Sequence, residues 1–294
     1  MLLAIPFPDI SPTLIEFPLG PITLAIRWYA LAYIAGIFLG FWIISRAIAR
    51  RELWPGDNAP MERSALDDLL TWIILGIILG GRAGYVLFYE PQHFLNNPAD
   101  IPKVWQGGMA FHGGFLGVVI AALVFCRRRQ IPYAQMADAL AIATPFGLML
   151  GRIANFINAE LWGRPTDVAW GVIFPGARAQ DCLGVEGLCA RHPSQLYEAG
   201  LEGLVLAIVV LWLAFARGWL KTPGAIWGVF VAGYGCARFF VEFYRVADDQ
   251  FISPDNPLGR VLQFGDFGLS MGQILSLPMI VVGLLVLGMA RRRA

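Results

Sequence analysis

The stretch that decides the fold lies at 139–164 and reads ALAIATPFGLMLGRIANFINAELWGR. It opens with an apolar run that contains Arg152, continues through the amides Asn155 and Asn158 and the carboxylate Glu160, and ends at Arg164. The surrounding segment 135–155 is long enough for a membrane span, which needs about 20 apolar residues. An ionisable group inside such a span is costly and usually faces a protein interior or a water-filled cavity. This stretch therefore predicts a membrane-spanning helix with a polar, functional end.

The composition extends this prediction to the whole chain. Of its 294 residues, 57% are hydrophobic and 15% are charged, against about 25% charged residues in soluble domains. The formal net charge of +1 says nothing about nucleic acid, but no basic arm is present, and we expect no nucleic-acid partner. We predict an all-α polytopic membrane protein with seven transmembrane helices. Their expected limits are 22–45, 67–89, 109–126, 135–155, 196–216, 224–244 and 269–290.

The connections between the spans are short except for 156–195. With no internal repeat, we expect a single membrane domain over 1–294 into which 156–195 is inserted as a small head or cap. The first basic residue is Arg27, so the N-terminus lacks the charged region of a cleaved signal peptide. Several prolines before this arginine predict an irregular or interfacial start.

Orientation follows from the distribution of Lys and Arg, which are enriched in cytoplasmic loops. The loops at one end of the predicted spans contain more Lys and Arg than the loops at the other end, so the first end is expected to be cytoplasmic. The N-terminus and the 156–195 cap are then outside, and the C-terminus is inside. The basic residues at the expected cytoplasmic end are Arg46, Arg50, Arg51, Arg63, Arg127, Arg128, Arg129, Arg217, Lys221, Arg291, Arg292 and Arg293.

Four arginines fall within the predicted spans, at Arg27, Arg82, Arg152 and Arg238. Together with His112 they are all expected in the outer-leaflet half of the bilayer. The planar guanidinium group forms paired, charge-assisted hydrogen bonds to phosphate, and at this depth the phosphate at hand is a phospholipid headgroup. The sequence thus predicts an anionic-lipid site near the outer surface.

Structural roles compete with this interpretation at two of the arginines. The side chain of Arg27 could instead extend to the membrane–water interface, because its neighbours Trp28 and Tyr29 are typical of the aromatic belt there. Arg82 lies among glycines that permit close helix packing, so an interhelical contact is at least as good an explanation.

The sixth span carries a continuous polar face. Tyr234, Arg238, Glu242 and Arg245 recur at helical spacing, and a pair between Arg238 and Glu242 would orient the arginine. His112 is followed by two glycines, and histidine titrates nearest to neutral pH. Alone it is a weak indication of acid–base chemistry, because a single histidine more often has a structural role.

The cysteines suggest no metal site. Cys126 and Cys236 lie in predicted spans and are most simply small apolar residues. Cys182 and Cys189 lie in the cap, where a disulfide between them is plausible but is not fixed by their spacing.

Two other functions are weighed against a lipid-modifying enzyme. A transporter would place polar groups across the bilayer and often shows an inverted repeat, whereas the polar residues here are expected at one depth. An intramembrane protease would need a serine nucleophile in context or paired aspartates in the spans, and neither is evident.

The chain closely resembles the prolipoprotein diacylglyceryl transferase family. The run Gly151–Gly163 matches the pattern Gly-Arg-x-x-Asn-Phe-x-Asn-x-Glu-x-x-Gly at every fixed position. Ala154 stands where glycine is common in the family. The other matching stretches follow in order along nearly the whole chain: 27–29, 80–85, 111–114, 192–198, 238–243 and 270–273.

The resemblance implies the reaction and its partners. The family transfers diacylglyceryl from phosphatidylglycerol to the lipobox cysteine in the signal peptide of a lipoprotein precursor, forming a thioether and releasing glycerol 1-phosphate. This is the first step of bacterial lipoprotein maturation. A bacterial plasma (inner) membrane location, contact with membrane lipids and a site in the outer-leaflet half are implied, with no cofactor and no metal.

The expected roles follow from this chemistry. Arg152 and Arg238 hold the phosphate and stabilise its developing charge, and His112 is the first choice for a base or for positioning the headgroup. The candidate catalytic residues are His112, Arg152, Arg238, Tyr29 and Glu242. The candidate phosphatidylglycerol-binding residues are Arg152, Arg238, Asn155, Glu160, Gly163, Tyr234 and His112.

Overall fold

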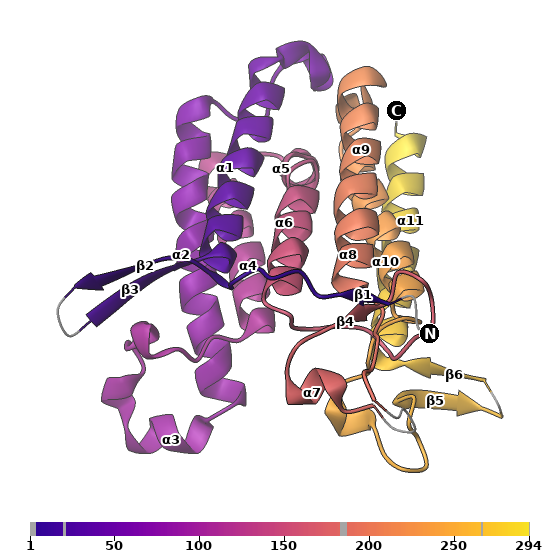
Figure 1. Cartoon of the computed structure of the whole chain (residues 1–294). Helices are drawn as coiled ribbons and strands as arrows, with labels where there is room; N and C mark the ends of the chain where they lie inside the picture. The colour runs from indigo at the N-terminus through magenta and orange to yellow at the C-terminus, as the bar shows by residue number, and fades with distance from the viewer. Residues whose placement is uncertain (1–3, 20–21, 183–186, 266, 294) are drawn as a thin grey trace.

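A computed structural model describes residues 4–19, 22–182, 187–265 and 267–293 as a bundle of antiparallel helices (Figure 1). Small two-stranded sheets and short helices gather at the end of the bundle near the labelled N-terminus, and the C-terminus lies at the opposite end (Figure 1). We call the first of these the cap end, because it carries the described part of 156–195. The long helices are α1 (Trp28–Ala49), α2 (Arg63–Phe88), α4 (Phe111–Arg129), α10 (Ala225–Val241) and α11 (Met271–Arg292).

Two further passes through the bundle are composite. The first consists of α5 (Tyr133–Ala141) and α6 (Thr144–Ile157), separated where Pro145 enters the first turn of α6. Proline lacks an N–H and cannot continue the preceding helix. The second runs through α8 (Ser194–Glu198), the π-helical η5 (Ala199–Val205), α9 (Leu206–Leu211) and η6 (Trp212–Ala216).

Within the part of the chain that the structure describes, six helical stretches are long and apolar enough to cross a membrane, counting each composite pass as one. The remaining pass, α10, is apolar but has 17 residues, about 26 Å at 1.5 Å per residue. The chain is thus mostly helical with six candidate membrane-spanning helices, as a polytopic membrane protein requires.

The prediction of an all-α fold is wrong in detail, because the described residues include three two-stranded sheets. Strand β1 (Ile5–Pro6) pairs in parallel with β4 (Val172–Ile173), joining the N-terminal segment to the cap. Strands β5 (Arg260–Phe264) and β6 (Phe267–Ser270) form a hairpin that leads directly into α11.

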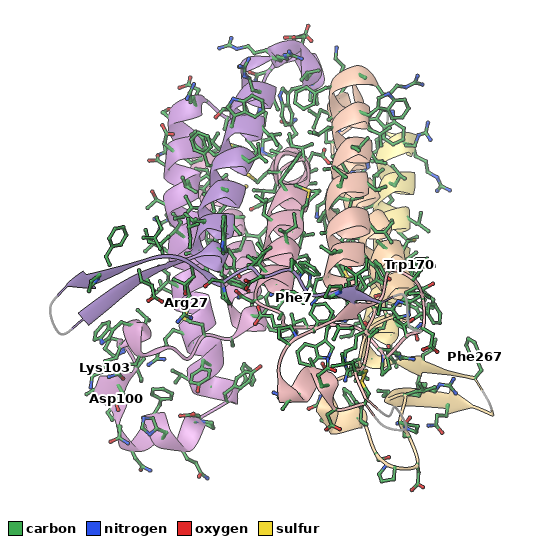
Figure 2. The ribbon with its side chains drawn as sticks, in the orientation of Figure 1. Phe7, Arg27, Asp100, Lys103, Trp170 and Phe267 are labelled. Atoms are coloured by element: carbon green, nitrogen blue, oxygen red, sulfur yellow. A yellow bond between two sulfur atoms is a disulfide. The ribbon has the colours of Figure 1, made fainter. Side chains whose placement is uncertain are left out.

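The predicted start of the first span is also wrong. Residues 22–27 form strand β3 (Ile22–Arg27), which pairs antiparallel with β2 (Thr13–Leu19), and α1 begins only at Trp28. The apolar run counted toward the span is rich in residues that favour strands, and the neighbouring β2 satisfies its backbone groups. Arg27 is exposed at the base of this hairpin, where it meets the bundle (Figure 2), rather than inside a span.

Glycines allow α2 and α4 to approach closely. A Cβ atom added to Gly80 would collide with the backbone of Gly113, and one added to Gly117 with the backbone of Gly76. Small residues at four-residue spacing bring membrane helices together because dispersion contacts replace the hydrophobic effect there. This contact brings α4 beside α2 on one side of the cavity described below.

Candidate active site

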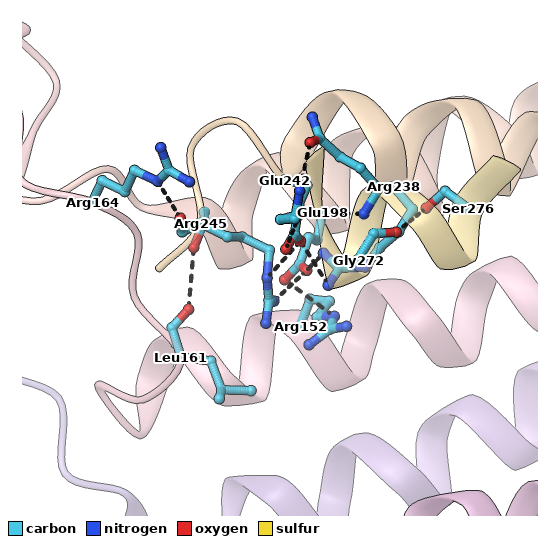
Figure 3. Close-up of polar contacts among 12 residues, drawn as sticks. Arg152, Leu161, Arg164, Glu198, Arg238, Glu242, Arg245, Gly272 and Ser276 are labelled. Atoms are coloured by element: carbon cyan, nitrogen blue, oxygen red, sulfur yellow. Dashed lines mark hydrogen bonds and ion pairs between the residues drawn. The ribbon is translucent and has the colours of Figure 1, made fainter. Parts of the chain in front are cut away.

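A fully buried carboxylate, Glu198, lies at the centre of the polar site. It is the last residue of α8, has 0% of its surface exposed, and receives three arginines (Figure 3). Its Oε1 accepts from Arg245 at 2.6 Å and from Arg238 at 3.1 Å, and its Oε2 lies 3.3 Å from Nε of Arg152. Charges buried in this way persist only when they are paired, so Glu198 ties α6, α8 and α10 together.

Glu242 is the second carboxylate of this cluster. Its Oε2 lies 2.9 Å from Arg238 and 3.4 Å from Nε of Arg245, and its Oε1 accepts a hydrogen bond of 3.0 Å from Ser270. A Cβ atom on Gly272 would lie 2.5 Å from the carboxylate carbon. The first turn of α11 therefore leaves just enough room for Glu242, and the predicted pair with Arg238 is confirmed.

Arg152 differs from Arg238 and Arg245 in that fewer of its hydrogen-bond donors have partners. It lies in the second half of α6, and its only ion pair among the described residues is made through Nε to Glu198. No hydrogen bond to the described part of the chain satisfies its two terminal amino groups. With 21% of its side chain exposed, Arg152 presents unused donors to a neighbouring cavity.

The cavity has a volume of about 670 Å³ and extends between α1, α2, α4, α5 and α6. Its polar end is formed by Arg152 and Asn155 with three tyrosines, and the rest of its wall is mostly apolar. Along α6 and α5 the lining runs from Arg152 to Leu140, about 18 Å at helical rise. The tyrosines are Tyr29, Tyr33 and Tyr234.

The end of α6 fixes the polar groups next to Arg152. Asn155 is buried and donates from Nδ2 to Oε1 of Glu160 at 2.7 Å. The chain turns sharply here, because Ala159 and Leu161 have positive φ angles of 51° and 57°. The Glu160 carbonyl accepts a 2.6 Å bond from Gln195. The predicted grouping of Arg152 with Asn155 is confirmed, since both line the cavity.

Gly163 occupies a crowded position between backbones. Its N–H donates to the His192 carbonyl at 2.8 Å, and a Cβ atom there would lie 2.7 Å from that same oxygen. The next residue, Arg164, donates to the carbonyls of Tyr244 and Arg245 at 2.9 and 2.6 Å. The cap thereby holds the backbone of Arg245 (Figure 3). Gly163 thus packs against backbone, and it does not line the cavity.

Arg82 has a structural role, but its hydrogen bonds go to a loop, whereas the neighbouring glycines suggested an interhelical contact. It is buried and donates to the carbonyls of Asp100, Ile101, Gly107 and Gly108 at 2.6 to 3.1 Å. All of these belong to the loop between α2 and α4, where Asp100 and Lys103 are labelled in Figure 2. Its donors are used within the protein, so Arg82 secures this loop.

His112 stands apart from the cluster. Its side chain is exposed in the first turn of α4, and it has no hydrogen-bond partner among the residues that the structure describes. Its neighbour Phe111 lines the cavity, whereas His112 does not. Tyr29, the other candidate for proton transfer, lies on the cavity wall and accepts a 3.2 Å hydrogen bond from Tyr33.

Sequence reasoning missed three features of this site. The sequence pattern placed Arg245 on the polar face of the sixth span but gave it no role in the site, and Glu198 was not among the candidate site residues, although both belong to the cluster. Glu202, one turn beyond Glu198, was not considered at all, although it is fully buried. The rule that singled out the arginines, an ionisable group inside an apolar span, applies equally to Glu198 and Glu202.

The cap contains the disulfide that the sequence left open. Cys182 and Cys189 are bonded, with Cα atoms 6.3 Å apart. Nearby, buried Arg191 donates to the carbonyls of Ala179 and Asp181 at 2.6 and 2.8 Å. The described part of the cap is therefore held together by a disulfide and by the hydrogen bonds that Arg191 donates to backbone carbonyls.

Comparison with known proteins agrees with this arrangement. Residues 15–289 match the family described as "Prolipoprotein diacylglyceryl transferase". A phosphatidylglycerol–prolipoprotein diacylglyceryl transferase from Cereibacter sphaeroides is 60% identical over 290 residues, 99% of each chain. Proteins of the same name from Roseobacter denitrificans and Rhizobium leguminosarum bv. trifolii are 57% identical (99% of each chain) and 50% identical (100% of this chain, 96% of the relative). The chain belongs to the prolipoprotein diacylglyceryl transferase family.

Proposed function

We propose that this protein transfers the diacylglyceryl group of phosphatidylglycerol to the lipobox cysteine of a prolipoprotein signal peptide. The observation that carries the proposal is Arg152, whose terminal amino groups are unused at the polar end of a long apolar cavity. A phospholipid matches this cavity, because its anionic headgroup would lie at the polar end and its apolar tails along the apolar wall. The names of the full-length relatives agree with this substrate.

The lipid fits the cavity in one direction only. Its phosphate would bind to Arg152 through charge-assisted hydrogen bonds, with Asn155, Glu160, Tyr29 and Tyr234 around the glycerol headgroup. The acyl chains would follow the apolar wall away from the cluster. The reverse orientation would bury a phosphate among apolar side chains, at a cost of several kcal/mol.

The reaction then requires an ionised thiol and a leaving phosphate. The thiol S–H bond breaks, the sulfur attacks the glycerol carbon, and the carbon–oxygen bond to phosphate breaks to release glycerol 1-phosphate. The phosphate changes from a diester with one negative charge to a monoester that can hold the thiol proton or lose it, with a second pKa of about 6. Arg152 and Arg238 stabilise the charge that develops on it.

Two roles remain to be assigned, the positioning of Arg238 and the removal of the thiol proton. Both guanidinium groups next to Glu242, those of Arg238 and Arg245, are ion-paired with it, so we assign it to positioning Arg238. His112 and Tyr29 remain the candidates for taking the thiol proton. His112 is the accessible one, and a base must reach the thiol either directly or through one water.

The location that we propose is the bacterial plasma (inner) membrane, with seven spans, the N-terminus outside and the active site in the outer-leaflet half. Three observations support it: the apolar helices, the alternation of helix direction (Figure 1), and the concentration of Lys and Arg in loops at the end opposite the cap. Accessibility labelling of cysteines introduced at the two ends in intact cells would test the orientation.

Turnover in vitro tests the function. Purified protein would be incubated with phosphatidylglycerol and a peptide carrying Leu-Ala-Gly-Cys, and mass spectrometry would detect diacylglyceryl addition at the cysteine. We expect addition by the parent protein and none by Arg152→Ala or Arg238→Ala. Folded parent protein that modifies no peptide would reject the proposal and favour the transporter alternative.

The same assay decides the role of His112. If it takes the thiol proton, His112→Gln should lose at least about 100-fold in kcat while the lipid KM changes little. Near-parental turnover by a folded variant would exclude His112 as the base and move Tyr29 to first place.

A further inference from the structure

Glu202 is a buried carboxylate without a visible partner. It lies in η5, has 0% exposure, and neither carboxylate oxygen has a hydrogen-bond partner among the described residues. Leaving a buried polar group unpaired costs free energy, and an unpaired charge costs more. Hydrophobic side chains of similar size would avoid this cost, so the carboxylate calls for a functional explanation.

The surroundings of Glu202 are the arginine cluster itself. It follows Glu198 by one helical turn in a π-helical stretch, a backbone feature that often marks functional sites. The structure brings charged and titratable groups toward it from α6, α8, α10 and the segment after α10. These groups are Arg152, Glu198, Tyr234, Arg238 and Arg245.

The charges of this cluster do not balance without Glu202. Among the described residues, the ion pairs join three guanidinium groups to two carboxylates, Glu198 and Glu242. One positive charge is left over in a low-dielectric interior. An ionised Glu202 would compensate it in the empty site. A bound phosphodiester would supply the same single negative charge, and an ionised Glu202 would then be in excess.

We propose that Glu202 is a positioning residue of the phosphate site, whose carboxylate balances the surplus arginine charge while the site is empty and takes up one proton when a phosphodiester anion binds at Arg152. The incoming anion and the carboxylate compete for the same positive charge, so binding one favours neutralising the other. The inference rests on the proposed lipid phosphate site and adds the group that responds to its occupation.

The consequence is a defined pH dependence of lipid binding. Since lipid binding carries proton uptake, the affinity must fall as the pH rises through the range in which Glu202 loses its proton in the free protein. One linked proton gives at most a tenfold change per pH unit. We expect the KM for phosphatidylglycerol to rise about tenfold between pH 6 and pH 9. In Glu202→Gln, which cannot ionise, KM should stay flat over this pH range.

Calorimetry counts the proton directly. Dihexanoyl phosphatidylglycerol would be titrated into detergent-solubilised protein in PIPES and in Tris, whose ionisation enthalpies differ. We expect uptake of up to one proton per lipid by the parent and by Glu52→Gln, an exposed glutamate at the other end of the bundle. Glu202→Gln should bind the lipid without proton uptake.

The outcomes separate this inference from the proposed function. Lipid that does not bind or react would count against the proposed function. Lipid that binds and reacts without proton uptake, or with equal uptake by Glu202→Gln, would overturn the role of Glu202 alone. Should Glu202→Gln fail to fold, Glu202→Asp carries the test. Its shorter carboxylate should shift the pH range of uptake, and an unchanged range would overturn the inference.

Discussion

The guanidinium group of Arg82 donates four hydrogen bonds to backbone carbonyls, whereas Arg152 keeps its terminal amino groups unengaged beside the cavity. Arg238 lies between these extremes, because two carboxylates take up its donors. The same residue type therefore serves as a loop anchor, a positioned charge and a binding group. The number of donors left over decides which of these roles it has.

Replacing Arg152 with lysine tests whether the shape of its donors matters beyond charge. Lysine keeps the charge but loses the planar fork that binds phosphate through two bonds. We expect Arg152→Lys to lower kcat/KM for phosphatidylglycerol by about 100-fold, equivalent to about 2.7 kcal/mol. Arg27→Lys, at the exposed base of the hairpin, is the matched control and should stay within threefold. A lysine variant as active as the parent would show that charge alone suffices.

Residue-level prediction from the sequence succeeded where a single residue is costly and failed where its partners are distant. Arg152 and Asn155 could be grouped because they are one helical turn apart in an apolar span. A structural role for Arg82 could be weighed from its neighbouring glycines, but its partners could not be predicted, because the carbonyls that accept its hydrogen bonds belong to a loop about 20 residues away. The burial of Glu202 likewise depends on helices that are remote in the sequence.

At the scale of elements, α10 depends on a residue of another helix. Asp138 of α5 is fully buried and accepts hydrogen bonds from the N–H groups of Gly224 and Trp227 at 2.6 and 2.8 Å. These donors at the N-terminus of α10 would otherwise lack partners in an apolar interior. Asp138 therefore acts as an N-terminal cap supplied from a neighbouring helix, and it fixes where α10 begins.

Removing this cap should weaken the protein without altering its chemistry. We expect Asp138→Ala to destabilise it by about 1–3 kcal/mol, seen as a lower midpoint of thermal unfolding in detergent, with near-parental kcat at low temperature. Asp67→Ala, which removes an exposed aspartate of α2, should leave the midpoint unchanged. Equal midpoints for the two variants would show that the cap contributes nothing.

The first turn of α11 offers a test in which stability and activity should move apart. Alanine is a better helix former than glycine by about 1 kcal/mol, yet a Cβ atom at Gly272 would displace the carboxylate of Glu242. We expect Gly272→Ala to lose at least about tenfold in kcat/KM, because Arg238 loses its alignment. Gly288→Ala in the same helix, where a Cβ atom meets nothing within 4 Å, should keep full activity. Full activity of Gly272→Ala would mean that Glu242 does not align Arg238.

Boundaries of elements were predictable only where helix-forming patterns continue to the membrane edge. The ends of α4 and α11 lie within three residues of the expected limits, whereas α1 begins six residues late because 22–27 pair with β2. Apolar content alone does not separate a span from an apolar strand. The partner strand, which lies before the predicted span, decides the conformation.

At the scale of the whole molecule, the cavity joins the polar cluster at the cap end to the apolar interior of the bundle. The buried core around Trp54, Leu69 and Ile142 fills the opposite end. Near the cluster, glycines replace such side chains: Gly147 and Gly151 line the cavity, and a Cβ atom at either would meet nothing within 4 Å. The space for a lipid is thus left open by missing side chains on α6.

Filling this space should change which lipids are used. Gly147→Leu places a branched side chain about one turn below Arg152, in the path of the acyl chains but clear of the phosphate site. We expect KM for long-chain phosphatidylglycerol to rise at least about tenfold, while dihexanoyl phosphatidylglycerol, whose tails end near this level, changes little. Gly288→Leu, at an open position of α11 outside the cavity lining, controls for added bulk. Because a phosphate defect would weaken both lipids equally, an equal loss for short and long chains would show that the acyl chains do not follow the cavity.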